Sequence, residues 1–358
     1  MSERTFIGLD VHARSVRAAV LDGLTGEVRS LDAPVPTKKL VGWICAQPAP
    51  QAVAYEAGPT GYVLARALDG AGVRCVVAAP SRILRAPAER IKTDRRDALK
   101  LARLLRLEEL VAVRVPDLTE EAARDLVRAR EDARIDLMRY RHRLSKLLLR
   151  RGIIWEQRAW TGTHELWLAR QRFAEAPLQL AYDEALQAMR SARDRRDALD
   201  RAIAEEATKE PWAAVVARLT CLRGVSTLTA FGLAVEIGDW QRFSGRGLAA
   251  FLGLTPSEDS SGATRHLGAI TKTGNGHLRR LLIEAAWQQR RPAGKNARVG
   301  LARASAPAAV RERARLAERR LYRRWMRFDE RGKRSNVAAV AIARELAGWC
   351  WSLAVMES

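Results

Sequence analysis

Residues 5–34 read TFIGLDVHARSVRAAVLDGLTGEVRSLDAP, and this stretch decides the fold. Its apolar runs predict three successive strands, Thr5–Asp10, Ser15–Asp22 and Glu27–Pro34, with a Gly-rich turn at residues 22–26. Neighbouring strands joined by short turns form an antiparallel meander. The chain is therefore expected to begin with three strands of one sheet.

Beyond the meander, helices and strands alternate as far as about residue 116. The pattern predicts helix Lys38–Gln47, strand Gln51–Ala57, helix Tyr62–Gly70, strand Val73–Ala79 and helix Thr93–Leu107. A meander followed by such units predicts a mixed sheet with helices on its faces. This order is typical of an RNase H-like α/β fold, whereas a Rossmann half does not begin with a meander.

The rest of the chain is predicted to be mostly helical. Leu118–Arg151 and Leu178–Thr208 are long and periodic, which indicates a coiled-coil hairpin joined through Trp155–Phe173, or else two ordinary bundle helices. Residues 212–291 predict two helices around a tight turn at Gly224, resembling a helix-hairpin-helix, and then a short helix, a Ser/Gly-rich loop and a basic helix. We therefore predict domains at 1–116, 117–210, 211–291 and 292–358, the last a basic helical segment.

The chain is strongly basic. Its 358 residues carry 62 Lys and Arg against 41 Asp and Glu, a formal net charge of +21, which favours a polyanionic partner. The four Cys are scattered, so neither a disulfide framework nor a structural zinc site is indicated. The N-terminus enters a strand without a basic and apolar leader, and residues 337–356 are interrupted by Arg344 and Glu345. We expect a cytoplasmic protein without a membrane span.

Four carboxylates stand out against this basic background. Asp10 ends the first strand and Glu56 the fourth, and these two strands are neighbours in the predicted topology. Asp94 and Asp97 lie three apart on one face of a helix start. Clustered carboxylates suit paired Mg²⁺ ions roughly 3.5–4 Å apart, which can polarise a phosphodiester. Taken singly, each has a structural alternative as a turn residue, an N-cap or a first-turn acid.

A second candidate element is the loop at residues 256–262, PSEDSSG. A Ser hydroxyl there could attack a phosphodiester while nearby cations stabilise the transition state. The same letters are also typical of a solvated turn, and the residues alone do not select one serine.

Two groups of basic residues accompany these elements. The group around the acidic helix start is Lys92, Arg95 and Arg96. The group after the serine loop is Arg265, Lys272, Arg279 and Arg280. We expect them to contact nucleic-acid backbone, although a solvated basic face is the alternative.

Five segments together resemble one family across nearly the whole chain. They are GLDVH, YEAGPTG, KTDRRDA, GVSTLTA…EIGDWQRF and LGLTPSEDSSG…LGAITKTGNGHLRRLLIEAAW. They are similar to the DEDD-type insertion-sequence transposases of the IS-one-ten family, which are RNA-guided DNA recombinases. The resemblance implies a RuvC-like domain, a coiled coil and a small helical transposase domain, with Mg²⁺ held by Asp10, Glu56, Asp94 and Asp97.

The resemblance also implies a mechanism and partners. Its serine nucleophile falls on Ser260, with Ser261 as the alternative, and strand cleavage passes through a covalent phosphoserine. The acidic site and the serine come from different subunits, so a dimer pairing to a tetramer is expected. A non-coding guide RNA selects the element ends and the target DNA. The role of the segment after Pro292 stays open.

The sequence leaves three other functions open. A junction-resolving or other RNase H-fold nuclease would use water in place of serine. IGLDVHARSVRAAVLD also resembles the phosphate-binding hairpin of actin-like and sugar-kinase ATPases, although no later Gly-rich loops follow. A basic architectural protein with a decayed site is the non-enzymatic alternative, and the four intact carboxylates argue against it.

Overall fold

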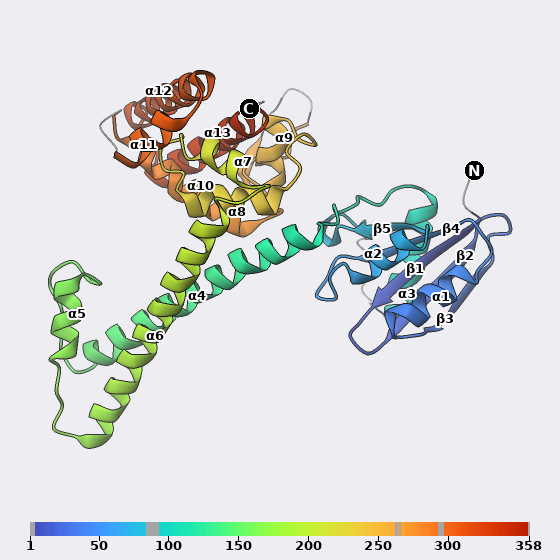
Figure 1. Cartoon of the computed structure of the whole chain (residues 1–358), viewed down its shortest axis with the longest axis horizontal. Coiled ribbons are helices and arrows are strands. Elements are labelled where there is room, and N and C mark those ends of the chain that lie inside the picture. The colour runs from blue at the N-terminus through green and yellow to red at the C-terminus, as the bar shows by residue number, and fades with distance from the viewer. Residues whose placement is uncertain (1–3, 84–92, 262–263, 265, 293–296, 357–358) are drawn as a thin grey trace. The chain divides into compact units, whose positions relative to one another are not determined.

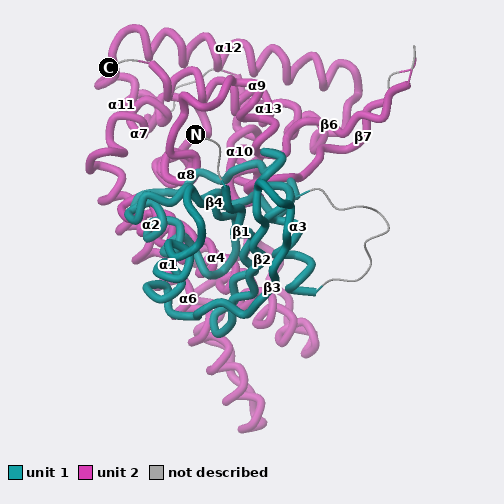
Figure 2. The backbone as a smooth tube through the Cα atoms, turned by 90° about the vertical axis from the view of Figure 1, so that its right-hand side faces the viewer, with its two compact units in different colours: residues 1–117 teal, residues 118–358 magenta. Residues whose placement is uncertain are grey.

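The computed structural model describes residues 4–83, 93–261, 264, 266–292 and 297–356. It divides into two compact units, Met1–Asp117 and Leu118–Ser358, coloured separately in Figure 2. Each unit has its own hydrophobic core and is described by itself.

Unit 1 is built on a five-stranded mixed sheet. The strands are β1 Thr5–Val11, β2 Val16–Asp22, β3 Val28–Ala33, β4 Gln51–Glu56 and β5 Arg74–Ala78. Their order is β3-β2-β1-β4-β5; β1 is antiparallel to β2 and parallel to β4. The predicted meander and mixed RNase H-like sheet are confirmed.

Helices cover both faces of this sheet. They are α1 Thr37–Cys45, α2 Val63–Gly70, the short 3₁₀ turn η1 Pro80–Arg82 and α3 Asp94–Arg106. Successive residues of β1 point to opposite faces, as in any strand. Ile7 and Leu9 pack in the cluster with α1 and α2, whereas Phe6 packs with Leu101 and Leu105 of α3. The sheet is therefore sandwiched, with α3 alone on the second face among the described helices (Figure 1).

Unit 2 begins with two long helices. These are α4 Leu118–Leu149 and α6 Ala176–Glu206, with the short α5 Gly162–Ala169 between them. Val127 near the start of α4 shares a cluster with Ile203 near the end of α6, while Leu144 shares another with Tyr182. The two helices therefore run antiparallel, as the hairpin in Figure 1 shows.

The remainder of unit 2 is mainly helical. Its elements are α7 Ala213–Leu219, α8 Thr227–Ile237, α9 Gly245–Phe251, β6 Pro256–Glu258, β7 Leu267–Ile270, α10 Gly276–Trp287, η2 Gln288–Arg290, α11 Ala297–Ser305, α12 Ala308–Glu330 and α13 Ser335–Ala354. One core cluster contains Phe231 of α8, Leu282 of α10, Trp325 of α12 and Leu346 of α13. Helices α12 and α13 thus pack into the same core as α8 and α10.

Two local features shape this core. Gly224 adopts φ +81°, and a Cβ there would lie 2.4 Å from the carbonyl oxygen of Ala285, so only glycine permits the turn before α8 to approach α10. Helix α13 is long and apolar enough to cross a membrane by length and composition alone. Its fully buried residues, including Ile342 and Cys350, form part of the core, which makes α13 a packed core helix.

Candidate active site

Asp10 and Glu56 lie at the carboxyl ends of two adjacent parallel strands. The register of β1 and β4 pairs Leu9 with Tyr55, and the next residues along the two strands are Asp10 and Glu56. The Tyr55 hydroxyl donates a hydrogen bond to the Gly61 carbonyl oxygen at 3.1 Å, which ties down the turn that follows Glu56. Strand pairing therefore brings both carboxylates to one edge of the sheet.

Helix α3 carries the other two carboxylates to β1. A Cβ at Gly8 would lie 1.9 Å from the backbone oxygen of Ala98, so the absence of a side chain allows α3 to press against the strand. Thr93 caps the helix, its hydroxyl accepting a hydrogen bond from the Arg96 amide. Asp94 and Asp97 are thus first-turn acids, which the helix dipole also favours, and the N-cap role belongs to Thr93.

The closest convergence joins Asp10, His12 and Asp94. The Nε2 atom of His12 lies 3.4 Å from Oδ1 of Asp10 and 3.9 Å from Oδ2 of Asp94. One ligand atom from each of the three residues lies within 4.8 Å of the others. The Asp10 side chain is 22% exposed and that of Asp94 is 61% exposed, so the group opens to solvent.

His12 is a site residue that the sequence interpretation did not assign. Its signal was its position two residues after Asp10, because alternate residues of an extended chain point the same way. Glu56 and Asp97 are absent from the group of mutually close ligand atoms found among the described residues. Strand register and helix phase place them on the neighbouring strand end and the same helix turn.

Cationic side chains flank this edge. Arg95 and Arg96 are exposed on the first turn of α3, between the two aspartates in sequence. Lys92, which belongs to the same predicted group, lies outside the described residues. The acids therefore sit beside positive charge able to contact a phosphate backbone.

The described part of the predicted serine loop belongs to a β-hairpin. The sequence interpretation expected only a loop, but β6 and β7 pair antiparallel, with Pro256 opposite Ile270 and Glu258 opposite Leu267. Strands this short show too little alternation to be recognised. Ser260 and Ser261 are exposed beyond the end of β6.

The two serines have different surroundings. The Ser260 hydroxyl donates to Oε1 of Glu258 at 3.0 Å and accepts from the His266 amide at 3.2 Å. Ser261 is joined to Thr264 by a pair of backbone hydrogen bonds of 3.2 and 3.1 Å. The oriented hydroxyl is therefore that of Ser260, with a carboxylate placed to accept its proton.

The basic residues after this hairpin differ in their contacts. Lys272 is exposed. Arg279 donates to the carbonyl oxygens of Leu252 and Thr273, both at 2.9 Å. Arg280 bonds Glu131 and Glu284, each at 2.6 Å. Arg265 lies outside the described residues.

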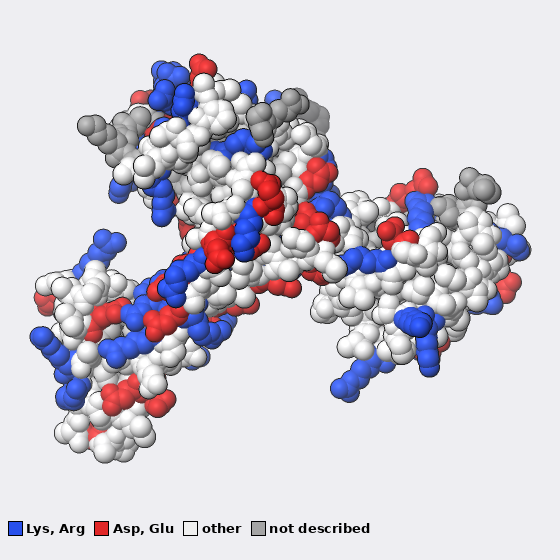
Figure 3. Space-filling model, viewed as in Figure 1, with Lys and Arg blue, Asp and Glu red and all other residues white. Residues whose placement is uncertain are grey.

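The long helices of unit 2 carry charges of both signs. Basic and acidic side chains alternate along α4 and α6 on the face in Figure 3. Arg130 pairs with Asp200 at 2.6 Å and Arg134 with Glu131 at 2.7 Å. Much of the positive charge of the long helices is therefore neutralised within the unit.

Comparisons with known proteins place this chain in a family. Residues 7–151 match the model of a DEDD transposase domain, and residues 216–298 match that of the transposase IS116/IS110/IS902 family. The transposase for insertion sequence element IS1533 of Leptospira borgpetersenii is 33% identical over 343 residues, covering 93% of this chain and 99% of that protein. The chain belongs to the IS110 transposase family. A candidate transposase of Sinorhizobium fredii, y4qE, is 41% identical over 360 residues, covering 98% of this chain and 88% of that protein.

Membership of the IS110 transposases also bears on the metal. A DEDD nuclease domain implies a divalent cation, and the described residues of this domain include one group of possible ligands, Asp10, His12 and Asp94. The donor set of Asp10, His12 and Asp94 offers carboxylate oxygens, which hard cations prefer, and one imidazole nitrogen, which Mn²⁺ and later metals also accept. The residues of this transposase therefore fit a divalent metal.

Proposed function

We propose that this transposase cuts and rejoins DNA strands of an insertion sequence with a carboxylate-held metal and a serine nucleophile. The observation that carries the proposal is the convergence of Asp10, His12 and Asp94 within 4.8 Å at the edge of a DEDD domain. The separate hairpin that presents Ser260 supplies the second half of the chemistry. DNA is the substrate that transposases act on, and the net charge of +21 suits it.

The metal site would be formed by Asp10, Glu56, Asp94 and Asp97, with His12 as an additional donor. Two Mg²⁺ ions suit four carboxylates, because cations offset the repulsion among them. When bound, the ions supply Lewis-acid polarisation of the scissile phosphate and neutralise its developing charge. The protein side chains orient the strand so that the phosphate lies over this edge, with Arg95 and Arg96 on its neighbouring backbone.

Ser260 would act as the nucleophile. Its hydroxyl already donates to Glu258, which can take the proton as Oγ attacks the phosphorus. The Oγ–P bond forms while the bond from phosphorus to one deoxyribose oxygen breaks, and that oxygen leaves with a proton. The phosphoserine conserves the bond energy, so attack by another deoxyribose hydroxyl rejoins strands and returns the serine hydroxyl. Ser261 is the alternative nucleophile.

The partners follow from the same proposal. The acidic site belongs to unit 1 and the serine hairpin to unit 2. We infer that the two halves of one working site come from different subunits, in a dimer that pairs to a tetramer, so that a single subunit does not cut. A non-coding guide RNA would choose the element ends and the target, consistent with the family resemblance.

The experiment compares three single substitutions in one hairpin. Ser260→Ala and Ser261→Ala are tested on labelled DNA with guide RNA and Mg²⁺ for a protein–DNA adduct that survives denaturing detergent. Ser257→Ala is the matched control, because Ser257 lies in the same hairpin and its hydroxyl donates to the Ala269 carbonyl oxygen at 3.1 Å. We expect Ser260→Ala to abolish the adduct and the other two variants to keep it.

The outcomes separate the alternatives. Loss with Ser261→Ala alone moves the nucleophile by one residue. Full recombination by both variants would show that the serine mechanism is wrong, and cleavage without any adduct would indicate a nuclease that uses water.

A further inference from the structure

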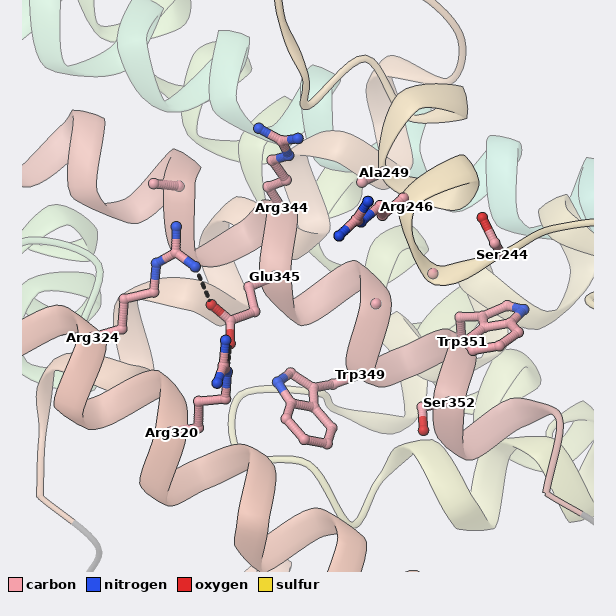
Figure 4. Close-up of a pocket in the computed structure, with 13 residues that line it drawn as sticks. Ser244, Arg246, Ala249, Arg320, Arg324, Arg344, Glu345, Trp349, Trp351 and Ser352 are labelled. Carbon is pink, nitrogen blue, oxygen red and sulfur yellow. Dashed lines mark hydrogen bonds and ion pairs between the residues drawn. The ribbon is translucent and has the colours of Figure 1, made fainter.

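A large open cavity lies in unit 2, between the start of α9 and the helices α12 and α13. Its volume is about 800 Å³, within the range of pockets that bind small organic groups. It is lined by residues from three separate segments, 244–249, 320–324 and 341–352 (Figure 4). None of these segments belongs to the metal site or to the serine hairpin.

The lining is strongly cationic. Arg246, Arg320, Arg324 and Arg344 all contribute, and Glu345 is the one acid among the described lining residues. Glu345 is only 14% exposed and is paired with both Arg320 and Arg324, as Figure 4 shows. Arg246 and Arg344 are exposed and form no ion pair with an acid in the described part of the chain, so they leave positive charge at the rim.

The cationic surface continues along α12. This helix has eight arginines and four acids. A second cavity of about 260 Å³ is lined by Arg320, Arg324, Arg327, Phe328 and Arg331. Residues spaced by three or four positions lie on one face of a helix, so the arginines form a continuous row that leads into the larger cavity.

Aromatic side chains give this basic site a flat apolar wall. Trp349 and Trp351 both line it. The Trp351 indole N–H donates to the Trp240 carbonyl oxygen at 3.2 Å, which holds this ring in the framework. A Cβ at Gly245 would lie 3.3 Å from the Cα of Gly348, so α9 and α13 meet closely at these two glycines. Trp349 is partly buried and projects from α13 beside the ion-paired arginines (Figure 4).

We propose that this cavity binds an unpaired nucleotide of a single-stranded nucleic acid. The base stacks on Trp349, its phosphates contact Arg246 and Arg344, and the preceding backbone follows the arginine row of α12. Aromatic platforms beside a positive groove are the elements of single-strand binding, because every base has a stacking face and every linkage a charge. The proposal rests on the proposed function only for its ligand class, nucleic acid.

The test measures binding without cleavage. The full chain is titrated in EDTA against fluorescent oligouridine and oligothymidine strands of about 10 nucleotides, a typical single-strand site size. We expect Trp349→Leu, which keeps an apolar side chain but removes the stack, to weaken binding about tenfold, and Trp349→Phe to retain most of it. Arg344→Gln should weaken binding and reduce the steepness of log affinity plotted against log salt concentration by about one. Arg315→Gln is the matched control, on the exposed surface of α12 outside the cavity.

A second measurement locates the base directly. A strand carrying a photoreactive halogenated uracil is crosslinked to the chain, and the modified peptide is identified by mass spectrometry. Crosslinking at Trp349, together with weaker binding by Trp349→Leu, supports the proposal. Whether Trp349→Leu loses affinity for RNA, for DNA or for both identifies the source of the nucleotide. Crosslinks confined to other residues, or Trp349→Leu binding both strands as tightly as the parent, overturn it.

Failure of the cavity proposal can be distinguished from failure of the proposed function. The binding assay contains no metal and measures no cleavage. Asp10→Asn and Ser260→Ala should therefore bind the oligonucleotides like the parent even if they no longer cleave DNA. If those variants still cleave DNA while Trp349→Leu loses binding, the cavity proposal stands alone.

Discussion

Gly8 of β1 lies directly against the backbone of Ala98 in α3: a Cβ at Gly8 would stand 1.9 Å from the Ala98 oxygen and 2.6 Å from the Ala102 nitrogen. Asp10 follows Gly8 by two residues, and Asp94 precedes Ala98 by about one helical turn. This one contact therefore sets how closely the acids of strand and helix approach. The glycine of the GLDVH segment supports the candidate metal site through packing.

Gly8→Ala should separate α3 from β1. The new methyl group has only backbone to displace, so we expect overpacking to cost about 1–3 kcal/mol of unfolding free energy and strand cleavage to fall by more than about tenfold. Thermal melting and the DNA cleavage rate measure the two effects. Gly42→Ala in α1 is the control, since nothing lies within 4 Å of its Cβ position, and it should be neutral or slightly stabilising. Normal cleavage by Gly8→Ala would refute this account.

His12 should contribute to metal binding. Its Nε2 atom is 3.4 Å from the Asp10 carboxylate, so His12→Asn removes a donor or its orienting contact. We expect the affinity for Mn²⁺, measured by calorimetry on the full chain, to fall by at least about tenfold. Asp10→Asn should fall further, because it removes a charged ligand. His142→Asn, at an exposed position of α4, should bind like the parent; equal binding by His12→Asn would exclude this role.

Local patterns predicted unit 1 well. The alternation of Phe6, Ile7 and Leu9 between two faces specifies register, and register in turn places Asp10 beside Glu56. Thr93 offered a capping signal as well, although the sequence interpretation placed it inside the helix Thr93–Leu107 and the structure makes it the N-cap. These features could be predicted because each depends on a few neighbouring residues.

Other features depend on distant segments and could not be predicted. The close packing of Gly8 with Ala98 joins residues 90 positions apart. Trp349 and Arg246 meet in one cavity only because α9 packs on α13, and neither segment alone indicates a binding site. The β6–β7 hairpin was missed for a different reason: its strands are three and four residues long, too short to show a period.

His277 should make unit 2 sensitive to mildly acidic pH. Burial lowers the pKa of His277, although the Glu131 carboxylate, 3.4 Å from Nδ1, acts in the opposite direction. The unfolded state, with a pKa near 6.5, then binds more protons than the folded state as the pH falls below that value. The free energy of unfolding is therefore fully retained above about pH 6.5 and decreases as the pH falls toward the lower folded pKa.

Thermal melting between about pH 7.5 and 5.5 tests this linkage. The His277→Gln variant should lose less stability over that interval than the parent does, whatever its stability at neutral pH. Burial also lowers the pKa of His164, so His164→Gln should flatten the profile in the same direction and some slope should remain in each single variant. Parallel profiles for the parent and His277→Gln would show that His277 does not titrate as its burial requires.

Glu318 should be the most sensitive charged residue of the unit 2 core. Its carboxylate pairs with Nε of Arg223 at 3.1 Å and with an Nη atom of Arg303 at 2.9 Å, and the side chain is 9% exposed. Glu318→Gln keeps the size but leaves the guanidinium groups of Arg223 and Arg303, 9% and 15% exposed, without a countercharge. This loss should cost about 3–5 kcal/mol of unfolding free energy. Denaturant unfolding of the full chain measures this loss.

The exposed pair of Arg139 and Asp136 provides the contrast. These two residues form an ion pair at 3.2 Å, but the Arg139 side chain is 65% exposed, so water screens the charge. Asp136→Asn should therefore change the unfolding free energy by less than about 1 kcal/mol. If Glu318→Gln also changed the unfolding free energy by less than about 1 kcal/mol, burial would not make the ion pairs of Glu318 costly to break. The neutral amide of that variant would then have to satisfy both guanidinium groups through hydrogen bonds alone.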